Sequence, residues 1–161
     1  DGNGAVTVNI GLVIEGAPVM GIVLAPAHDR LFCGLVGDGA SEIAAGKARD
    51  IAVRPVPGSG PVAVASRLHR DEETDNWLTA HGIAETISTG SSMKFCLVAA
   101  GEADVYPRFG PTMEWDTAAG DAVLRAAGGR MITPDGAPYL YGKPDYRSTA
   151  FIACGGFMPA N

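Results

Sequence analysis

Apolar residues in the first 50 positions follow the alternation typical of β-strands. The runs VTVNIGLVI and VMGIVLA flank the turn Glu15-Gly16-Ala17-Pro18, a pattern typical of an antiparallel hairpin. A third strand is expected at Arg30–Leu35, followed by a turn at 37–39 and an extended segment over 41–44. After Ala48, a segment rich in Pro and Gly indicates a loop that continues to Pro61. Residues 1–50 therefore predict an antiparallel β meander.

From Val62 onward, strand and helix patterns alternate. Strands are expected at 61–66, 84–89, 105–109, 130–133 and 150–154, and helices at 70–82, 91–104 and 114–129. Acidic residues begin the first of these helices and Gly82 follows it, as the helix dipole and C-cap preferences favour. Such alternation predicts helices that cover a mixed sheet. The expected fold class is therefore α/β (α+β mixed), with residues 51–161 forming the α/β part.

Length and charge narrow the range of functions. The 161 residues contain no repeat and suffice for one domain with a core. With 12 basic and 18 acidic residues, the formal charge is -6, so the average surface repels polyanions and a nucleic-acid polymer is not expected as a partner. A small anionic ligand would need a local cluster of Lys, Arg, backbone N–H groups or metal.

The cysteines and the apolar segments indicate a cytoplasmic protein. Cys33, Cys96 and Cys154 are odd in number and far apart, without a CxxC pair, which favours free thiols in a reducing compartment over a disulfide. The most apolar stretch, 6–26, is interrupted by polar residues, Gly and Pro, so no membrane span is expected. The start of the chain lacks the basic leader of a signal peptide.

Several positions could bind an anion, and each has a simpler alternative. Gly90-Ser91-Ser92 lies between a predicted strand and a predicted helix, where N–H groups form a natural anion site, and Lys94 follows. The alternative is that a serine only caps the helix. Arg108 lies among apolar neighbours, and its alternative is a surface or ion-paired arginine. His69 ends a predicted strand, where α/β sheets form ligand crevices, or is an exposed loop histidine.

Asp116 follows Trp115 at the start of the third predicted helix. An aspartate there also caps a helix and interacts favourably with its dipole. The same helix has one narrow side made of small residues, namely Ala118, Ala119, Gly120, Ala122, Ala126, Ala127 and Gly128. This narrow side would allow another backbone to approach closely and hold Asp116 rigidly beside a neighbouring loop.

The segment GSSMKFCLVAAGEADVYPRFGPTMEWDTAAGDAVLRAAGG, residues 90–129, resembles a signature region of the inositol monophosphatase superfamily of magnesium-dependent, lithium-sensitive phosphatases. Its hallmark is Trp-Asp-x-Ala-Ala-Gly followed by Ala-Gly-Gly. Within it, GSSxKFCLVA and YPRFGPT, with SRLHRDEET upstream, resemble the branch of 3'(2'),5'-bisphosphate nucleotidases. GAVTVNIGLVIEGAPVMGIVLAP resembles the strand pair of the family, so the resemblance covers nearly the whole chain.

The resemblance implies a layered sugar-phosphatase sandwich and a specific set of roles. Asp116 would hold a catalytic Mg²⁺, Ser91, Lys94 and Arg108 would contact substrate phosphates, and His69 would lie near the base or ribose. The implied reaction removes the 3'-phosphate of adenosine 3',5'-bisphosphate, a by-product of sulfate activation, through metal-activated water and without a covalent phosphoenzyme. A homodimer is left open.

This sequence departs from the family pattern in one respect, because the first signature of the family, Asp-Pro-Ile/Leu-Asp-Gly-Thr, is not in it. That signature supplies further metal-binding aspartates. Asp1-Gly2 is expected to belong to the linker that follows the signature. The resemblance therefore implies a chain that corresponds to the part after this motif and lacks the N-terminal layers. Because Mg²⁺ binds weakly to a single carboxylate, this chain alone should have little activity. An uncovered apolar face should also cause association or poor stability.

Two alternatives to the nucleotidase hypothesis stay open. One is another enzyme of the superfamily, acting on inositol monophosphate or fructose 1,6-bisphosphate. Lys94 and the YPRFGPT segment favour the nucleotidase, because two separated phosphates need cationic contacts beyond the metals. The other alternative is an inactive nucleotide-binding module, which the absence of the first signature favours.

Overall fold

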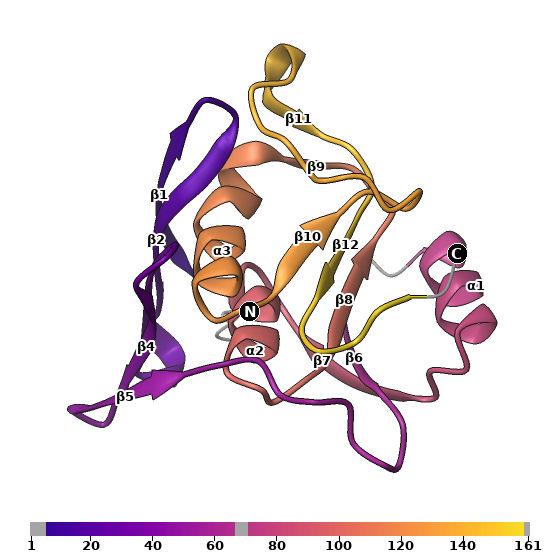
Figure 1. Ribbon diagram of the computed structural model, residues 1–161, viewed down its shortest axis with the longest axis horizontal. Helices are drawn as coiled ribbons and strands as arrows, with labels where there is room; N and C mark the ends of the chain where they lie inside the picture. The colour runs from indigo at the N-terminus through magenta and orange to yellow at the C-terminus, as the bar shows by residue number, and fades with distance from the viewer. Residues whose placement is uncertain (1–5, 67–70, 160–161) are drawn as a thin grey trace.

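The computed structural model describes residues 6–66 and 71–159. Within this part of the chain, two sheets enclose helices α2 and α3, while α1 lies on the far side of the second sheet (Figure 1). The helices are α1 (Glu72–Ala80), α2 (Met93–Ala99) and α3 (Glu114–Ala126). None of the helices described here has the length and hydropathy of a membrane span. The mixed α/β class predicted from the sequence is confirmed.

The first sheet is an antiparallel meander with its strands in chain order. Its strands are β1 (Val8–Ile14), β2 (Ala17–Ala25), β3 (Arg30–Leu35), β4 (Gly39–Ala44) and β5 (Lys47–Ile51), and the short 3-10 helix η1 (Pro26–His28) connects β2 to β3. The predicted hairpin and third strand are confirmed. The predicted loop up to Pro61 begins only after Ile51, because Ala45 and Gly46 both have positive φ and form a tight turn that pairs β5 with β4.

The second sheet is mixed, with the strand order β10-β12-β8-β6-β7. Its strands are β6 (Val62–Ser66), β7 (Glu85–Thr89), β8 (Val105–Arg108), β10 (Arg130–Ile132) and β12 (Phe151–Cys154). β6 runs parallel to β7 and β8, whereas β12 runs antiparallel to β8 and β10. The helix predicted over 91–104 ends at Ala99 instead, because Gly101 adopts a φ of +71° and ends the last turn.

A third, two-stranded sheet was not predicted. β9 (Thr112–Met113) pairs antiparallel with β11 (Arg147–Ser148), which follows the 3-10 helix η2 (Pro144–Tyr146). Strands of two residues are too short for apolar alternation to identify. This small sheet lies directly before the start of α3 and becomes part of the candidate site.

The narrow side of α3 packs against glycines of the meander, as the run of small residues predicted. A Cβ added to Gly21 of β2 would lie 2.1 Å from the carbonyl oxygen of Ala119, and one on Gly34 of β3 would lie 2.7 Å from the Cα of Val123. A Cβ added to Gly11 of β1 would also be too close, at 2.9 Å from the backbone nitrogen of Ala119. The helix and the sheet therefore approach backbone to backbone, which fixes the position of α3.

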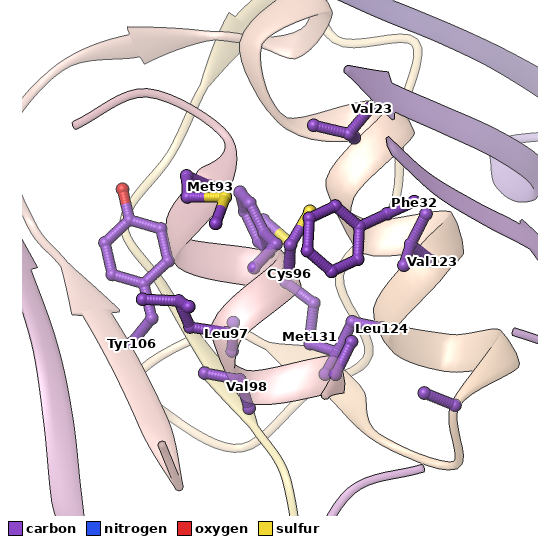
Figure 2. Packing of buried hydrophobic residues seen from close by; sticks show 14 of the residues in the cluster. Val23, Phe32, Met93, Cys96, Leu97, Val98, Tyr106, Val123, Leu124 and Met131 are labelled. Atoms are coloured by element: carbon purple, nitrogen blue, oxygen red, sulfur yellow. The ribbon is translucent and has the colours of Figure 1, made fainter. Parts of the chain in front are cut away.

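The main core lies between the two sheets, around α2 and α3. Figure 2 shows Cys96 of α2 between Phe32 of the meander and Tyr106 of β8, and all three side chains are buried. The Tyr106 ring also packs edge-on against Phe95 and Phe151 at centroid distances of 5.1 and 5.3 Å. This packing fixes Tyr106, whose hydroxyl group reaches the candidate site.

The face of the meander that points away from α3 is apolar and exposed. Because Gly11, Gly21 and Gly34 face the helix, their neighbours along each strand face outward. These neighbours include Ile10, Leu12 and Leu35, which are 55%, 46% and 48% exposed, together with Val8, Leu24 and Ile43. The exposed apolar face expected from the sequence is thus present in this chain.

Candidate functional site

Asp116 lies in the first turn of α3 and uses one carboxylate oxygen to cap the helix. Its Oδ2 accepts hydrogen bonds from Oγ1 of Thr112 at 3.1 Å and from the backbone N–H of Met113 at 3.4 Å. Among the residues described, Oδ1 has no hydrogen-bond partner. The capping alternative is therefore correct for one oxygen, and the other remains available to a ligand.

Arg108 at the end of β8 is held by its own loop. Its Nη2 donates to the carbonyl oxygen of Pro111 at 2.7 Å, its Nε to that of Gly110 at 3.3 Å, and its Nη1 to the Tyr106 hydroxyl at 3.5 Å. These three acceptors are neutral. The guanidinium is therefore held in place, and no carboxylate in the described part of the chain forms a direct ion pair with it.

Asp71 joins the start of α1 to this same loop. Its carboxylate accepts the backbone N–H of Thr74 at 2.8 Å as the N-cap of α1. Burial raises the pKa of Asp71, but hydrogen bonds from Thr74 and from the N–H of Gly110, with the charge of Arg108, outweigh burial and lower it. Asp71 thus stays ionised and anchors the loop that holds Arg108.

Lys94 lies beneath the site rather than on its surface. Only 2% of the residue is exposed, its Nζ donates to the carbonyl oxygen of Ser91 at 2.8 Å, and it lies 5.1 Å from the ring centroid of Tyr106. Burial, and to a smaller extent the charge of Arg108, lower its pKa to about 8, although the charge of Asp116 partly opposes them. Direct phosphate contact by Lys94 therefore stays a prediction, whereas its electrostatic coupling to Arg108 and Asp116 follows from its position.

The two serines before α2 do not cap it through their side chains. Ser92 occupies the N-cap position without a capping hydrogen bond, and its Oγ instead donates to the carbonyl oxygen of Asp116 at 3.1 Å. Ser91 adopts a φ of +53°, and its exposed hydroxyl lies 2.5 Å from Oγ1 of Thr7. The N-cap alternative was wrong. Ser92 instead ties α2 to the start of α3, beside Asp116.

A cavity of about 370 Å³ brings several of these side chains together. Arg108, Thr112 and Asp116 line it, and Arg147 and Ser148 of β11 form another part of its wall. The register of the small sheet places Arg147 opposite Met113 and Ser148 opposite Thr112. Sequence reasoning missed both residues of β11, because no motif or periodicity distinguishes them.

Glu114 was also missed, and it fixes the loop that leads to β11. Only 5% exposed, it accepts the backbone N–H groups of Gly142 at 2.8 Å and Lys143 at 3.1 Å, and the Nζ of Lys143 at 3.2 Å. Burial raises its pKa, but these hydrogen bonds and the lysine charge outweigh burial and lower it. The only available signal was an acidic residue at a helix start, which usually indicates a dipole interaction.

Four of the five predicted site residues therefore lie in one region. Tyr106 connects Arg108 to Lys94, and Ser92 connects the Ser91 turn to Asp116. The fifth, His69, lies outside the described residues, as does Asp1.

The fit to a metal ion is partial. Oδ1 of Asp116 can supply one oxygen ligand of the kind that Mg²⁺ prefers. In the described ranges, no group of three or more His, Cys, Asp or Glu side chains is arranged to hold a metal. These residues thus provide one ligand and do not form a complete metal site by themselves.

Comparisons with known proteins all point to one family of phosphatases. Residues 1–155 match the inositol monophosphatase family. The chain is 45% identical over 139 residues to the 3'(2'),5'-bisphosphate nucleotidase CysQ of Escherichia coli strain K12, covering 86% of this chain and 55% of that protein. It is 30% identical to a putative inositol monophosphatase 3 of Drosophila pseudoobscura, covering 87% of this chain and 39% of that protein. The chain thus spans about half the length of the CysQ proteins it matches.

Solved structures of the same family share the fold. CysQ from Bacteroides thetaiotaomicron superposes with a TM-score of 0.87 at 39% identity, over 97% of this chain and 65% of that chain. An inositol monophosphatase from Anabaena gives a TM-score of 0.74 at 28% identity, over 93% of this chain and 60% of that chain.

Proposed function

This chain belongs to the inositol monophosphatase family, and we propose that its protein removes the 3'-phosphate of adenosine 3',5'-bisphosphate. The observation that carries the proposal is the cavity that Arg108 and Asp116 both line. An acidic protein needs such a local cation to bind a multiply charged anion. The identity to a protein named as a 3'(2'),5'-bisphosphate nucleotidase supports the choice of substrate.

Arg108 is suited to hold a phosphate in a fixed place. Its hydrogen bonds go to two carbonyl oxygens and one hydroxyl, so its charge remains available for a charge-assisted contact. Lys94 adds a second positive charge beneath, and the hydroxyl of Ser91 is exposed beside it. In the proposal these three groups bind substrate phosphate, and His69 lies near the base or ribose.

We propose Mg²⁺ as the cofactor, with Oδ1 of Asp116 as one of its ligands. When bound, the metal would make a water nucleophilic and neutralise charge on the phosphate and on the departing oxygen. The water oxygen forms a bond to phosphorus, the bond between phosphorus and the 3'-oxygen breaks, and that oxygen takes up a proton. The products are adenosine 5'-monophosphate and inorganic phosphate. Because the described residues supply one carboxylate here, this chain by itself should turn over little substrate.

In the proposal, the substrate is a by-product of sulfate activation. We also propose that the protein is cytoplasmic. The free state of Cys33, Cys96 and Cys154 agrees with a reducing compartment.

A second candidate function is nucleotide binding without turnover. The observation in its favour is that, in the described part of the chain, no group of three or more His, Cys, Asp or Glu side chains that could hold a metal forms around Asp116. Binding without phosphate release would be its signature.

The proposed function is tested by phosphate release from the full-length gene product. Adenosine 3',5'-bisphosphate, inositol 1-phosphate and fructose 1,6-bisphosphate are compared, each with and without Mg²⁺ and with added Li⁺. We expect the nucleotide to be hydrolysed with the highest kcat/KM, only with Mg²⁺, and more slowly with Li⁺. Faster turnover of either sugar phosphate would favour another activity of the family. Calorimetric binding of the nucleotide without any release would favour the second candidate.

A further inference from the structure

We propose that Arg147 and the hydroxyl of Ser148 bind the phosphate that is not hydrolysed and so make the protein select substrates that carry two phosphates. This inference rests on the proposed function, because it assigns the second phosphate of that substrate. Arg147 and Ser148 line the same cavity as Arg108 and Asp116, but they lie outside the family signatures described above.

The placement of Arg147 follows from the small sheet. β11 pairs with β9, so Arg147 lies opposite Met113 and Ser148 opposite Thr112. Met113 directly precedes α3, and its N–H is held by the carboxylate of Asp116. The backbone ladder thus couples the Arg147 wall of the cavity to the start of the helix that carries Asp116.

Glu114 holds the other side of this wall. Its carboxylate accepts the N–H groups of Gly142 and Lys143, and the chain then passes through η2 to Arg147. With the ladder on one side and Glu114 on the other, the backbone at Arg147 is positioned by α3 itself. A guanidinium on a positioned backbone can bind a phosphate with defined geometry.

The Arg147 side chain is available for a ligand. It is exposed and makes no hydrogen bond or ion pair to any residue within 6–66 and 71–159. By contrast, four other arginines pair with carboxylates, namely Arg30, Arg49, Arg54 and Arg125. Arg108 also donates to two carbonyl oxygens of its own loop. Arg147 therefore keeps its planar set of donors for a bidentate contact with phosphate.

Ser148 provides a second, independent observation. Its Oγ is buried and has no hydrogen-bond partner among the described residues, yet the residue lines the cavity. A buried hydroxyl without a partner is unfavourable. Rotation of the Ser148 side chain toward the cavity would let its hydroxyl donate to an oxygen of a phosphate held by Arg147.

Asp116 and Arg147, which both line the cavity, suit two different phosphates. A phosphate beside the Asp116 carboxylate is repelled unless a cation lies between them, so the proposed function puts the reacting phosphate beside Asp116 and the metal that it would help to hold. Arg147 needs no metal to attract a phosphate. The non-reacting phosphate of adenosine 3',5'-bisphosphate is the one on the 5'-oxygen, and we assign it to Arg147 and Ser148.

The test uses the full-length gene product and its variants R147A, R147K and S148A. Values of kcat/KM are measured for adenosine 3',5'-bisphosphate and for adenosine 3'-monophosphate, which lacks the 5'-phosphate. Loss of a charge-assisted contact should lower the ratio of the two values about 10- to 100-fold in R147A, mainly through KM for the bisphosphate. R147K should lose part of this selectivity, because lysine keeps the charge without the planar donors. The inhibition constant of adenosine 5'-monophosphate should rise in parallel.

The matched control is R130A, because Arg130 is an exposed arginine at the start of β10 that does not line the cavity. Its selectivity ratio should equal that of the wild type, and thermal unfolding should show that all variants fold. If the wild type hydrolyses the bisphosphate but R147A and S148A keep its selectivity ratio, this inference is overturned and the proposed function stands. If the wild type does not hydrolyse the bisphosphate, the proposed function and this inference are both overturned.

Discussion

The ammonium group of Lys94 donates a hydrogen bond to the carbonyl oxygen of Ser91 at 2.8 Å, although only 2% of the residue is exposed. Its other close contact is the ring of Tyr106, 5.1 Å away. A positive charge is thus buried beneath the cavity on neutral partners. Burial of a charge without an opposite charge in direct contact lowers the free energy of unfolding.

Replacing Lys94 by methionine should therefore stabilise the fold while weakening substrate binding. Folding lowers the pKa of Lys94 from 10.5 to about 8. The unfolded chain binds more protons between these two values, so stability rises with pH across this window. Below pH 8 both states are charged and the full penalty remains, about 3–4 kcal/mol at roughly 1.4 kcal/mol for each pKa unit. K94M should gain most of that at pH 7, measured by urea unfolding.

The advantage of K94M over the wild type should shrink between pH 8 and 10.5, because the wild-type lysine loses its proton there. K47M serves as the control, since Lys47 is an exposed lysine of β5, and it should change stability little at any pH. A K94M variant that is less stable than the wild type at pH 7 would mean that the buried contacts stabilise the charge.

Gly21→Ala should disrupt the contact between the meander and α3. The added Cβ would lie 2.1 Å from the carbonyl oxygen of Ala119, a backbone atom that cannot rotate away, so we expect a loss of roughly 3 kcal/mol or more of unfolding free energy. Gly58→Ala is the matched control, because its Cβ would meet no atom within 4 Å and its φ is not in the left-handed region. The control should be neutral or slightly stabilising in chemical denaturation. Equal effects of the two substitutions would argue against close backbone packing.

The sequence predicted helices and strands correctly where the local pattern of apolar and small residues matches the packing in the folded protein. Arg30–Leu35 was identified to the residue because apolar residues bounded by turn signals leave one interpretation. The small residues of α3 predicted close packing, although the three glycines they meet are separated from them by about a hundred positions. Asp116 was recognised through the Trp-Asp signature. Its structural role is to cap α3 through one carboxylate oxygen. From the sequence, helix capping was only the alternative to metal binding.

What the sequence could not predict depends on tertiary context. β5 carries no apolar alternation and exists because a tight turn brings it onto β4. Arg147 belongs to a two-residue strand whose partner lies 34 positions earlier, at Met113. Lys94 was expected to contact substrate phosphate, and only the packing around Tyr106 reveals its burial.

The exposed apolar face of the meander should make the 161-residue chain associate when it is expressed alone. Ile10 and Leu12 are 55% and 46% exposed on adjacent outward positions of β1, and each buried Å² of such surface contributes about 25 cal/mol to association. Replacing both by threonine keeps a residue that favours strands and should lower dye binding and the apparent mass in gel filtration. V56T, at an exposed valine outside the meander, is the control and should leave both unchanged. Unaltered association of the double variant would exclude this face as the cause.

Asp116→Asn should separate the two uses of this carboxylate in the full-length protein. The amide oxygen can still accept hydrogen bonds from Thr112 and the N–H of Met113, so the helix start should lose no more than about 1 kcal/mol of charge–dipole interaction. The negative charge on the oxygen proposed to bind Mg²⁺ disappears, and activity should fall beyond the roughly 10- to 100-fold typical of groups that only support a metal ligand. Phosphate release, Mg²⁺ titration and thermal unfolding measure these effects, with D38N in an exposed turn as the control. Full turnover with the wild-type Mg²⁺ dependence in D116N would remove Asp116 from the proposed metal site, because the neutral amide cannot replace an anionic oxygen ligand.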